Sequence, residues 1–232
     1  MKKADLYVLI GVVLFFAPFF FIDSVYNTYH HINLEYPMIM SFFKFAILAT
    51  FGETIGLRIR EGKYNYKGFG LMPRALVWGM IGLTIKLAFI IFATGTPVFL
   101  ETIFGLQHAT AFSSMELNIT KILVAFSISV AMNVIYAPIM MTMHKITDTH
   151  IMKNGGTLPG FFKPIKLGEI SQNMNWTVQW NFVFKRTIPL FWIPAHTITF
   201  LLPSHVRVLF AALLGIALGV ILAIASLKGQ NK

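Results

Sequence analysis

The sequence contains no cysteine and few charged residues. Without cysteine, disulfide bonds and thiolate chemistry are excluded. Only 12% of the 232 residues are charged, whereas a soluble protein usually carries about 25%. Because 56% of the residues are hydrophobic, the chain cannot cover a soluble surface with polar groups, and lipid is its expected solvent. The composition therefore predicts an integral membrane protein.

Lysine and arginine are missing from two long stretches, residues 4–43 and 87–120. By contrast, five cations lie within residues 58–74 and four within residues 145–170. Loops that alternate between no cations and many cations are what the positive-inside rule predicts for a multi-pass membrane protein. The two cation-rich stretches are therefore expected on the inner side of the membrane.

The formal net charge of +10 would also suit a nucleic-acid-binding protein. We exclude nucleic acid as a partner, because the cations are divided among loops on one membrane side. The predicted partners are the lipid bilayer and the anionic lipid headgroups of the inner side. Small solutes and a second copy of the chain, as in a homo-oligomer, stay open as further partners.

Six apolar segments have about the length of a membrane-spanning helix, which takes roughly 17–25 residues. They are residues 6–22, 38–57, 75–98, 122–143, 187–202 and 206–227. The fifth is short and contains Pro189, Pro194 and His196, so it is expected to be broken or re-entrant. Residues 173–184 hold two tryptophans and favour an interfacial helix. We predict an all-α polytopic transmembrane helical bundle with about six membrane-embedded segments.

The N-terminal apolar run resembles a signal peptide, but bulky residues at 19–23 make a poor cleavage site. We therefore predict an uncleaved first span. The chain divides into residues 1–37, an extra N-terminal helix with its outer loop, and residues 38–232, the main helical bundle.

The charge pattern also predicts the orientation. Residues 23–37 and 97–120 are expected outside, whereas both termini, with Lys228 and Lys232, are expected inside. The expected location is a bacterial-type cytoplasmic membrane, or an organellar membrane if the source is eukaryotic.

Polar residues in the second and third segments point to an interior lining. One helical face of the second segment contains Ala46, Ala49, Thr50, Glu53, Gly56 and Arg60. Lys44 lies on another face and is expected to reach the headgroups. Lys86 lies near mid-bilayer, where a charge is costly and indicates function by default. Three interpretations of Lys86 stay open. It lines an aqueous path that favours anions, it forms a structural ion pair with Glu53, or it is a neutral buried lysine.

The fourth and sixth segments carry further patterned faces. Polar and small residues share one face of the fourth segment: Ser129, Asn133, Tyr136, Ala137, Met140 and His144. They bond to neighbouring helices or line a cavity. Small residues recur every four positions in the sixth segment: Ala211, Gly215, Gly219 and Ala223. With Gly82 of the third segment, they predict close helix packing, which we expect to occur within one chain.

Catalysis and metal binding are not expected. The nine carboxylates are all more than four residues apart, and the seven histidines are scattered. Met140, Met141, Met143 and His144 would suit copper, but adjacent helix positions point in different directions. We therefore predict no catalytic residues, no metal and no cofactor.

Four motifs appear in a fixed order along residues 42–227. They are Gly52-Glu53, Gly82-x-x-x-Lys86, Asn133-x-x-x-Ala137-Pro138, and a block from Pro194 through Pro203-x-x-x-Arg207. Together they resemble the family of peroxisomal membrane protein 2 and the mitochondrial inner-membrane Mpv proteins. His196 stands near the family's Gln, Met132 replaces its Asp, and Lys86 replaces its His.

The resemblance implies a membrane helical bundle with channel or pore activity for small solutes and a part in organelle homeostasis. We predict a small-solute channel or pore lined by Glu53, Lys86, Asn133, His196 and Arg207. The alternative is a non-transporting membrane scaffold or stress-response protein, in which the same groups join helices.

Overall fold

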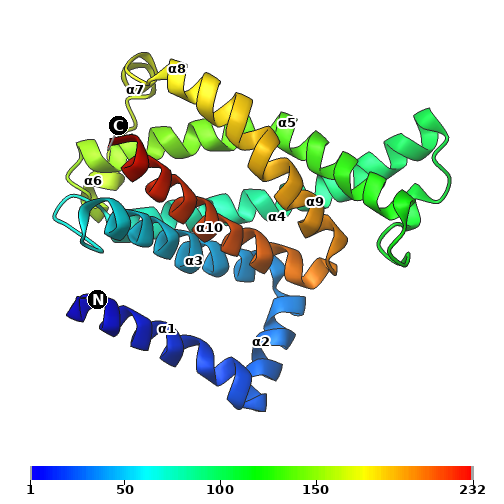
Figure 1. Ribbon diagram of the computed structural model, residues 1–232, viewed down its shortest axis with the longest axis horizontal. Helices are drawn as coiled ribbons and strands as arrows, with labels where there is room; N and C mark the ends of the chain where they lie inside the picture. The colour runs from blue at the N-terminus through cyan, green and yellow to red at the C-terminus, as the bar shows by residue number, and fades with distance from the viewer. Residues whose placement is uncertain (1, 231–232) are drawn as a thin grey trace. The chain divides into compact units, whose positions relative to one another are not determined.

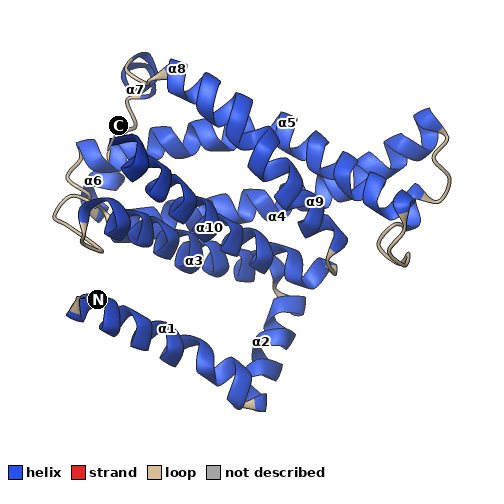
Figure 2. Cartoon of the chain, in the orientation of Figure 1, coloured by secondary structure: helices blue, strands red, loops and turns tan. Residues whose placement is uncertain are grey.

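The structure, a computed structural model, describes residues 2–230 and side chains up to residue 224. Over this part the chain is helical and contains no strand (Figure 2). The predicted all-α fold is confirmed. The end of the sixth apolar segment, with Lys228 and Lys232, lies outside the residues whose side chains are described.

Long helices dominate the described chain (Figure 1). Their bounds are α1 (Lys3–Phe21), α2 (Asp23–Glu35), α3 (Pro37–Glu61), α4 (Leu71–Phe104), η1 (Ala109–Ala111), α5 (Ile119–Lys153), α6 (Leu158–Phe161), α7 (Leu167–Gln172), α8 (Trp176–Val178), η2 (Gln179–Trp192), α9 (Ile193–Leu201) and α10 (Ser204–Gln230). Five of them are long and apolar enough to cross a membrane, namely α1, α3, α4, α5 and α10. The chain is therefore a helical membrane protein.

The fifth predicted segment changes from a π-helix to an α-helix along its length. Its residues lie in η2, a π-helix, and in the nine-residue α9, which follow one another without a non-helical residue, and neither element is itself a candidate span. Pro189 and Pro194 lack the N–H group that a regular helix needs. Of the expected interfacial helix at 173–184, residues 176–184 are helical, because α8 runs directly into η2; its interfacial position stays a prediction.

Residues up to Met40 form one compact unit, so the division falls a few residues after the predicted boundary at 37. Most of the predicted outer loop 23–37 forms α2, so its expected loop conformation is wrong, whereas its place outside the membrane stays a prediction. No glycine or proline interrupts residues 23–35, and Ile22 alone is extended between α1 and α2. The rings of Phe19 and Tyr29 meet edge to face with centroids 5.4 Å apart and hold the two helices together.

The second unit runs from Ser41 and contains the bundle proper. Small residues allow its helices to approach closely. A Cβ atom on Gly82 of α4 would lie 2.6 Å from the carbonyl oxygen of Ser41 on α3. A Cβ atom on Gly52 of α3 would lie 2.9 Å from Cα of Ile216 on α10. The Ser41 hydroxyl also donates to the Gly82 carbonyl at 2.6 Å, which fixes the α3–α4 contact.

Helices α4 and α5 are longer than the spans predicted within them. With 34 and 35 residues, they extend about 50 Å at 1.5 Å per residue, against a hydrocarbon core of about 30 Å. They project together past α9 and α10 (Figure 1). The predicted loop 97–120 begins later than expected, since α4 continues through a buried Pro97 to Phe104, and residues 105–118 form the connection to α5 with the short η1 within it.

Candidate functional site

The second unit encloses a cavity of about 540 Å³. Its walls come from α3, α4, α5, η2, α9 and α10. The volume lies in the range of natural ligand sites, which is roughly 300–1,000 Å³. Most of the lining is apolar. Many of the polar lining residues belong to one of two groups, and the others lie singly along the walls.

The cavity has an exposed end and a buried end. Arg60, Glu61 and Lys145 are exposed residues of its lining, where α3 ends and α5 runs toward its cation-rich end. At the other end the lining is buried, with Asn133 fully covered and His196 only 7% exposed. The cavity therefore leads from the cation-rich helix ends into the interior of the bundle.

A glycine on α10 helps to keep this space open. A Cβ atom on Gly215, which lines the cavity, would meet no atom within 4 Å. Gly219 is different, because a Cβ atom there would lie 3.2 Å from the carbonyl oxygen of Gly52. Of the small residues predicted for packing, Gly82, Gly219, Ala211 and Ala223 lie at buried or close contacts, whereas Gly215 borders empty space.

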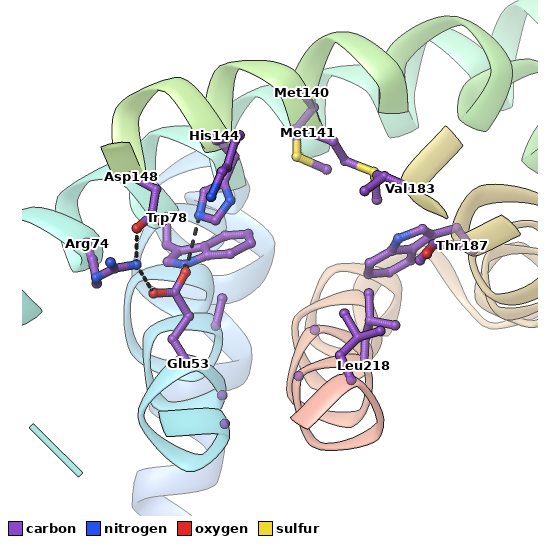
Figure 3. Close-up of a pocket in the computed structure, with 18 of the residues that line it drawn as sticks. Glu53, Arg74, Trp78, Met140, Met141, His144, Asp148, Val183, Thr187 and Leu218 are labelled. Atoms are coloured by element: carbon purple, nitrogen blue, oxygen red, sulfur yellow. Dashed lines mark hydrogen bonds and ion pairs between the residues drawn. The ribbon is translucent and has the colours of Figure 1, made fainter. Parts of the chain in front are cut away.

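A charged cluster forms one wall of the cavity (Figure 3). Glu53 of α3 forms an ion pair with Arg74 of α4, and Arg74 also contacts Asp148 of α5. The other oxygen of Glu53 accepts a hydrogen bond from Trp78 Nε1 at 2.8 Å and lies 3.2 Å from His144 Nε2. Both carboxylate oxygens of Glu53 are thus engaged, and a single arginine joins three helices.

Arg74 is held in this position by the start of α4. Its Nε donates to the Phe69 carbonyl at 2.7 Å, and its guanidinium lies 4.4 Å from the centroid of the Phe69 ring. Gly70, which precedes α4, has φ +78°, and a Cβ atom there would lie 2.4 Å from the side chain of Ile151 on α5. Only glycine fits this turn, so the local backbone aims Arg74 into the bundle.

A second polar group lies at the buried end of the cavity. The Asn133 amide and His196 Nδ1 are 3.0 Å apart, and the same amide donates to the Ser129 carbonyl at 2.8 Å. The Ser129 hydroxyl donates to the Ile193 carbonyl at 2.7 Å. The Trp192 ring stacks on His196 with centroids 5.1 Å apart. These contacts fasten α9 and the end of η2 to α5.

The structure brings together three of the five predicted lining residues. Glu53, Asn133 and His196 lie on the cavity, whereas Lys86 and Arg207 do not. Glu53 pairs with Arg74 and not with Lys86, so the alternative of a Glu53–Lys86 ion pair is wrong. Arg207 instead donates to the carbonyl oxygens of Leu202 and Phe200 at 2.9 and 3.0 Å, near the end of α9.

Lys44 also differs from expectation. It is only 7% exposed and lies inside the bundle, so its side chain does not extend outward to the headgroups. Helix α4 packs closely against α3 in this region, through Ser41 and Gly82.

Sequence reasoning missed Arg74 and Asp148 as members of the site. Arg74 looked like one more cation of a loop, although it lies one helical turn before Trp78. Asp148 likewise lies one turn after His144 on α5. These two spacings were the available signal, but neither identifies Glu53 as the common partner.

Besides Asp148 Oδ1, which forms an ion pair with Arg74, two buried donors of cavity-lining residues have no hydrogen-bond partner within the described chain. They are Nε2 of Gln179, a residue 6% exposed, and Nε1 of Trp192. Both residues belong to η2, one at each end. Nearly all buried polar groups in proteins are paired with protein or with ordered water, so a water or a ligand is the expected partner of each donor.

No group of three or more metal-ligating side chains occurs among the residues that the structure describes. Comparison of the chain with protein-family models, with curated proteins and with solved structures finds no match.

Proposed function

We propose that this membrane protein is a channel or pore for small solutes and that the cavity is part of the solute path. The observation that supports the proposal is the cavity itself, which connects exposed residues at the cation-rich helix ends with buried polar groups on α5 and α9. The resemblance to the peroxisomal membrane protein 2 and Mpv family points the same way. The positive-inside rule would place the exposed end of the cavity on the inner side of the membrane.

The proposal predicts that filling the cavity stops transport. A Cβ atom at Gly215 meets no atom within 4 Å and the residue lines the cavity, so the ring of Gly215→Phe is expected to narrow the path. We expect solute flux in proteoliposomes to fall to the level of empty liposomes. Small anions, cations and neutral sugars should be measured together.

The matched control is Gly95→Phe. Gly95 is an exposed glycine of α4, a Cβ atom there also meets nothing within 4 Å, and the residue does not line the cavity. Its flux should equal that of the native chain. Equal flux from both variants would show that solutes do not pass through the cavity.

Lys86 offers a second test of the path. Because this lysine lies outside the cavity lining, Lys86→Met should leave flux and ion preference unchanged in the same proteoliposomes. A loss of flux in this variant would mean that the path leaves the cavity and continues past Lys86, as the sequence pattern alone suggested.

A non-transporting scaffold is the second candidate, and one observation favours it. Both oxygens of Glu53 are occupied by Arg74, Trp78 and His144, as expected for a group that joins helices. Absence of flux above empty liposomes, with folded and inserted native protein, would leave this candidate in place of the channel.

A further inference from the structure

We infer that the cavity binds an amphiphilic oxyanion, a molecule with an apolar body and a carboxylate or phosphate end. The inference names the solute class of the proposed path, and in its transport role it rests on that proposal. It depends on three features of the cavity: its remaining hydrogen-bond donors, the charge at its exposed end and its apolar walls.

The donors come first. The cavity lining contains two carboxylates of the charged cluster, but Glu53 is satisfied by three neighbours and Asp148 lies against Arg74. Three buried atoms of lining residues have no hydrogen-bond partner within the described chain: Asp148 Oδ1, which forms an ion pair with Arg74, and two N–H donors, Gln179 Nε2 and Trp192 Nε1. Leaving a buried donor unpaired costs about 1–3 kcal/mol, but the two donors lie at opposite ends of η2, so one oxyanion can accept from at most one of them.

The charge at the exposed end selects the same chemistry. Arg60 and Lys145 are exposed lining residues, and neither forms an ion pair with any side chain in the described part of the chain. Glu61 also lies there, but Lys63 Nζ approaches its carboxylate at 3.5 Å. The exposed end therefore carries a surplus of positive charge, which suits an oxyanion and repels an ammonium group.

The body of the ligand follows from the remaining walls. Met140, Met141, Val183 and Leu218 face the space opposite and beside the charged cluster (Figure 3). Methionine side chains adapt to ligands of different shape, which suits a flexible alkyl chain. A small hydrated anion would leave this surface uncovered, whereas an amphiphile places its chain there and its oxyanion near Arg60 and Lys145.

The test measures binding to the full native chain in a neutral detergent by native mass spectrometry. The probes are dodecanoate, dodecyl phosphate, dodecylammonium, dodecanol and the short anion butyrate. We expect dodecanoate and dodecyl phosphate to bind at one site. Binding of dodecylammonium, dodecanol and butyrate should each be about ten-fold weaker or undetectable. The loss of one charged or hydrogen-bonded interaction changes an affinity by about ten-fold.

Variants locate the site. Gly215→Phe should abolish retention of dodecanoate, and Arg60→Gln with Lys145→Gln should weaken it about ten-fold. The matched controls are Gly95→Phe, and Lys163→Gln for loss of an exposed cation outside the cavity. Retention that Gly215→Phe leaves unchanged would place the ligand elsewhere and overturn the inference.

The probes also distinguish a free small anion from an amphiphile, and they test the binding inference separately from the channel proposal. Equal binding of butyrate and dodecanoate would identify a free small anion in place of an amphiphile, and equal binding of dodecylammonium would exclude an anion site. Both results overturn the inference. Solute flux without amphiphile binding would refute it and keep the channel, whereas amphiphile binding without any flux would keep the binding site and refute the channel.

Discussion

Arg74→Met should unfold the bundle more readily than any other single substitution considered for this protein. The change leaves Glu53 and Asp148 as two carboxylates without their common cation, on side chains that are each only 19% exposed. Removing one partner of a buried ion pair costs about 3–5 kcal/mol, and a single membrane-embedded carboxylate is costly in itself. We expect a large fall in the midpoint of thermal unfolding in detergent.

The comparison with Arg186→Met separates this effect from loss of a cation in general, because Arg186 of η2 is exposed and forms no ion pair within the described residues. That variant should unfold like the native chain. Adding Glu53→Gln and Asp148→Asn to Arg74→Met should restore much of the stability, since it removes the uncompensated charges. If the triple variant is no more stable than Arg74→Met, charge pairing does not hold the three helices together.

Gly82→Ala should destabilise the chain through one added methyl group. The new Cβ atom would lie 2.6 Å from the Ser41 carbonyl oxygen and 2.8 Å from Cβ of Phe45, both on α3. The two helices must separate, which also lengthens the hydrogen bond from the Ser41 hydroxyl to the Gly82 carbonyl. Overpacking of this kind costs about 1–3 kcal/mol, which thermal unfolding in detergent will show.

The same substitution should increase stability at Gly95, an exposed glycine of the same helix. Gly95→Ala adds its methyl group where nothing lies within 4 Å, and alanine stabilises a helix by about 0.5–1 kcal/mol relative to glycine. The opposite effects of one substitution on one helix therefore report packing and not helix propensity. Similar effects at both positions would contradict the close α3–α4 contact.

The sequence predicted best those parts of the molecule that follow the helical period. Spacings of three and four residues placed Glu53 on an interior face of α3, and Asn133 and His144 on an interior face of α5, and all three line the cavity. Hydrophobicity located the long helices but not their ends. Pro97 and the polar residues after Asp23 were taken for loops, although both lie in helices that tertiary contacts extend.

The period of a regular α-helix could not predict which residues of the π-helix η2 line the cavity. Gln179, Thr187 and Trp192 line the cavity from one side although a regular helix would not align them. A π-helix follows i→i+5 hydrogen bonds, so the period used to recognise faces does not apply to it. Arg74 was missed for another reason: a cation at the end of a span satisfies the positive-inside rule whether or not it turns inward.

The place of Arg74 in the chain also bears on how the protein is made. Helices α3 and α4 leave the ribosome before α5, because synthesis proceeds from the N-terminus. Glu53 and Arg74 can therefore form their ion pair when the α3–α4 hairpin inserts into the membrane. Neither side chain then enters the lipid as an unpaired charge. Asp148 of α5 is synthesised after Glu53 and Arg74. Its partner Arg74 is therefore already present when α5 inserts.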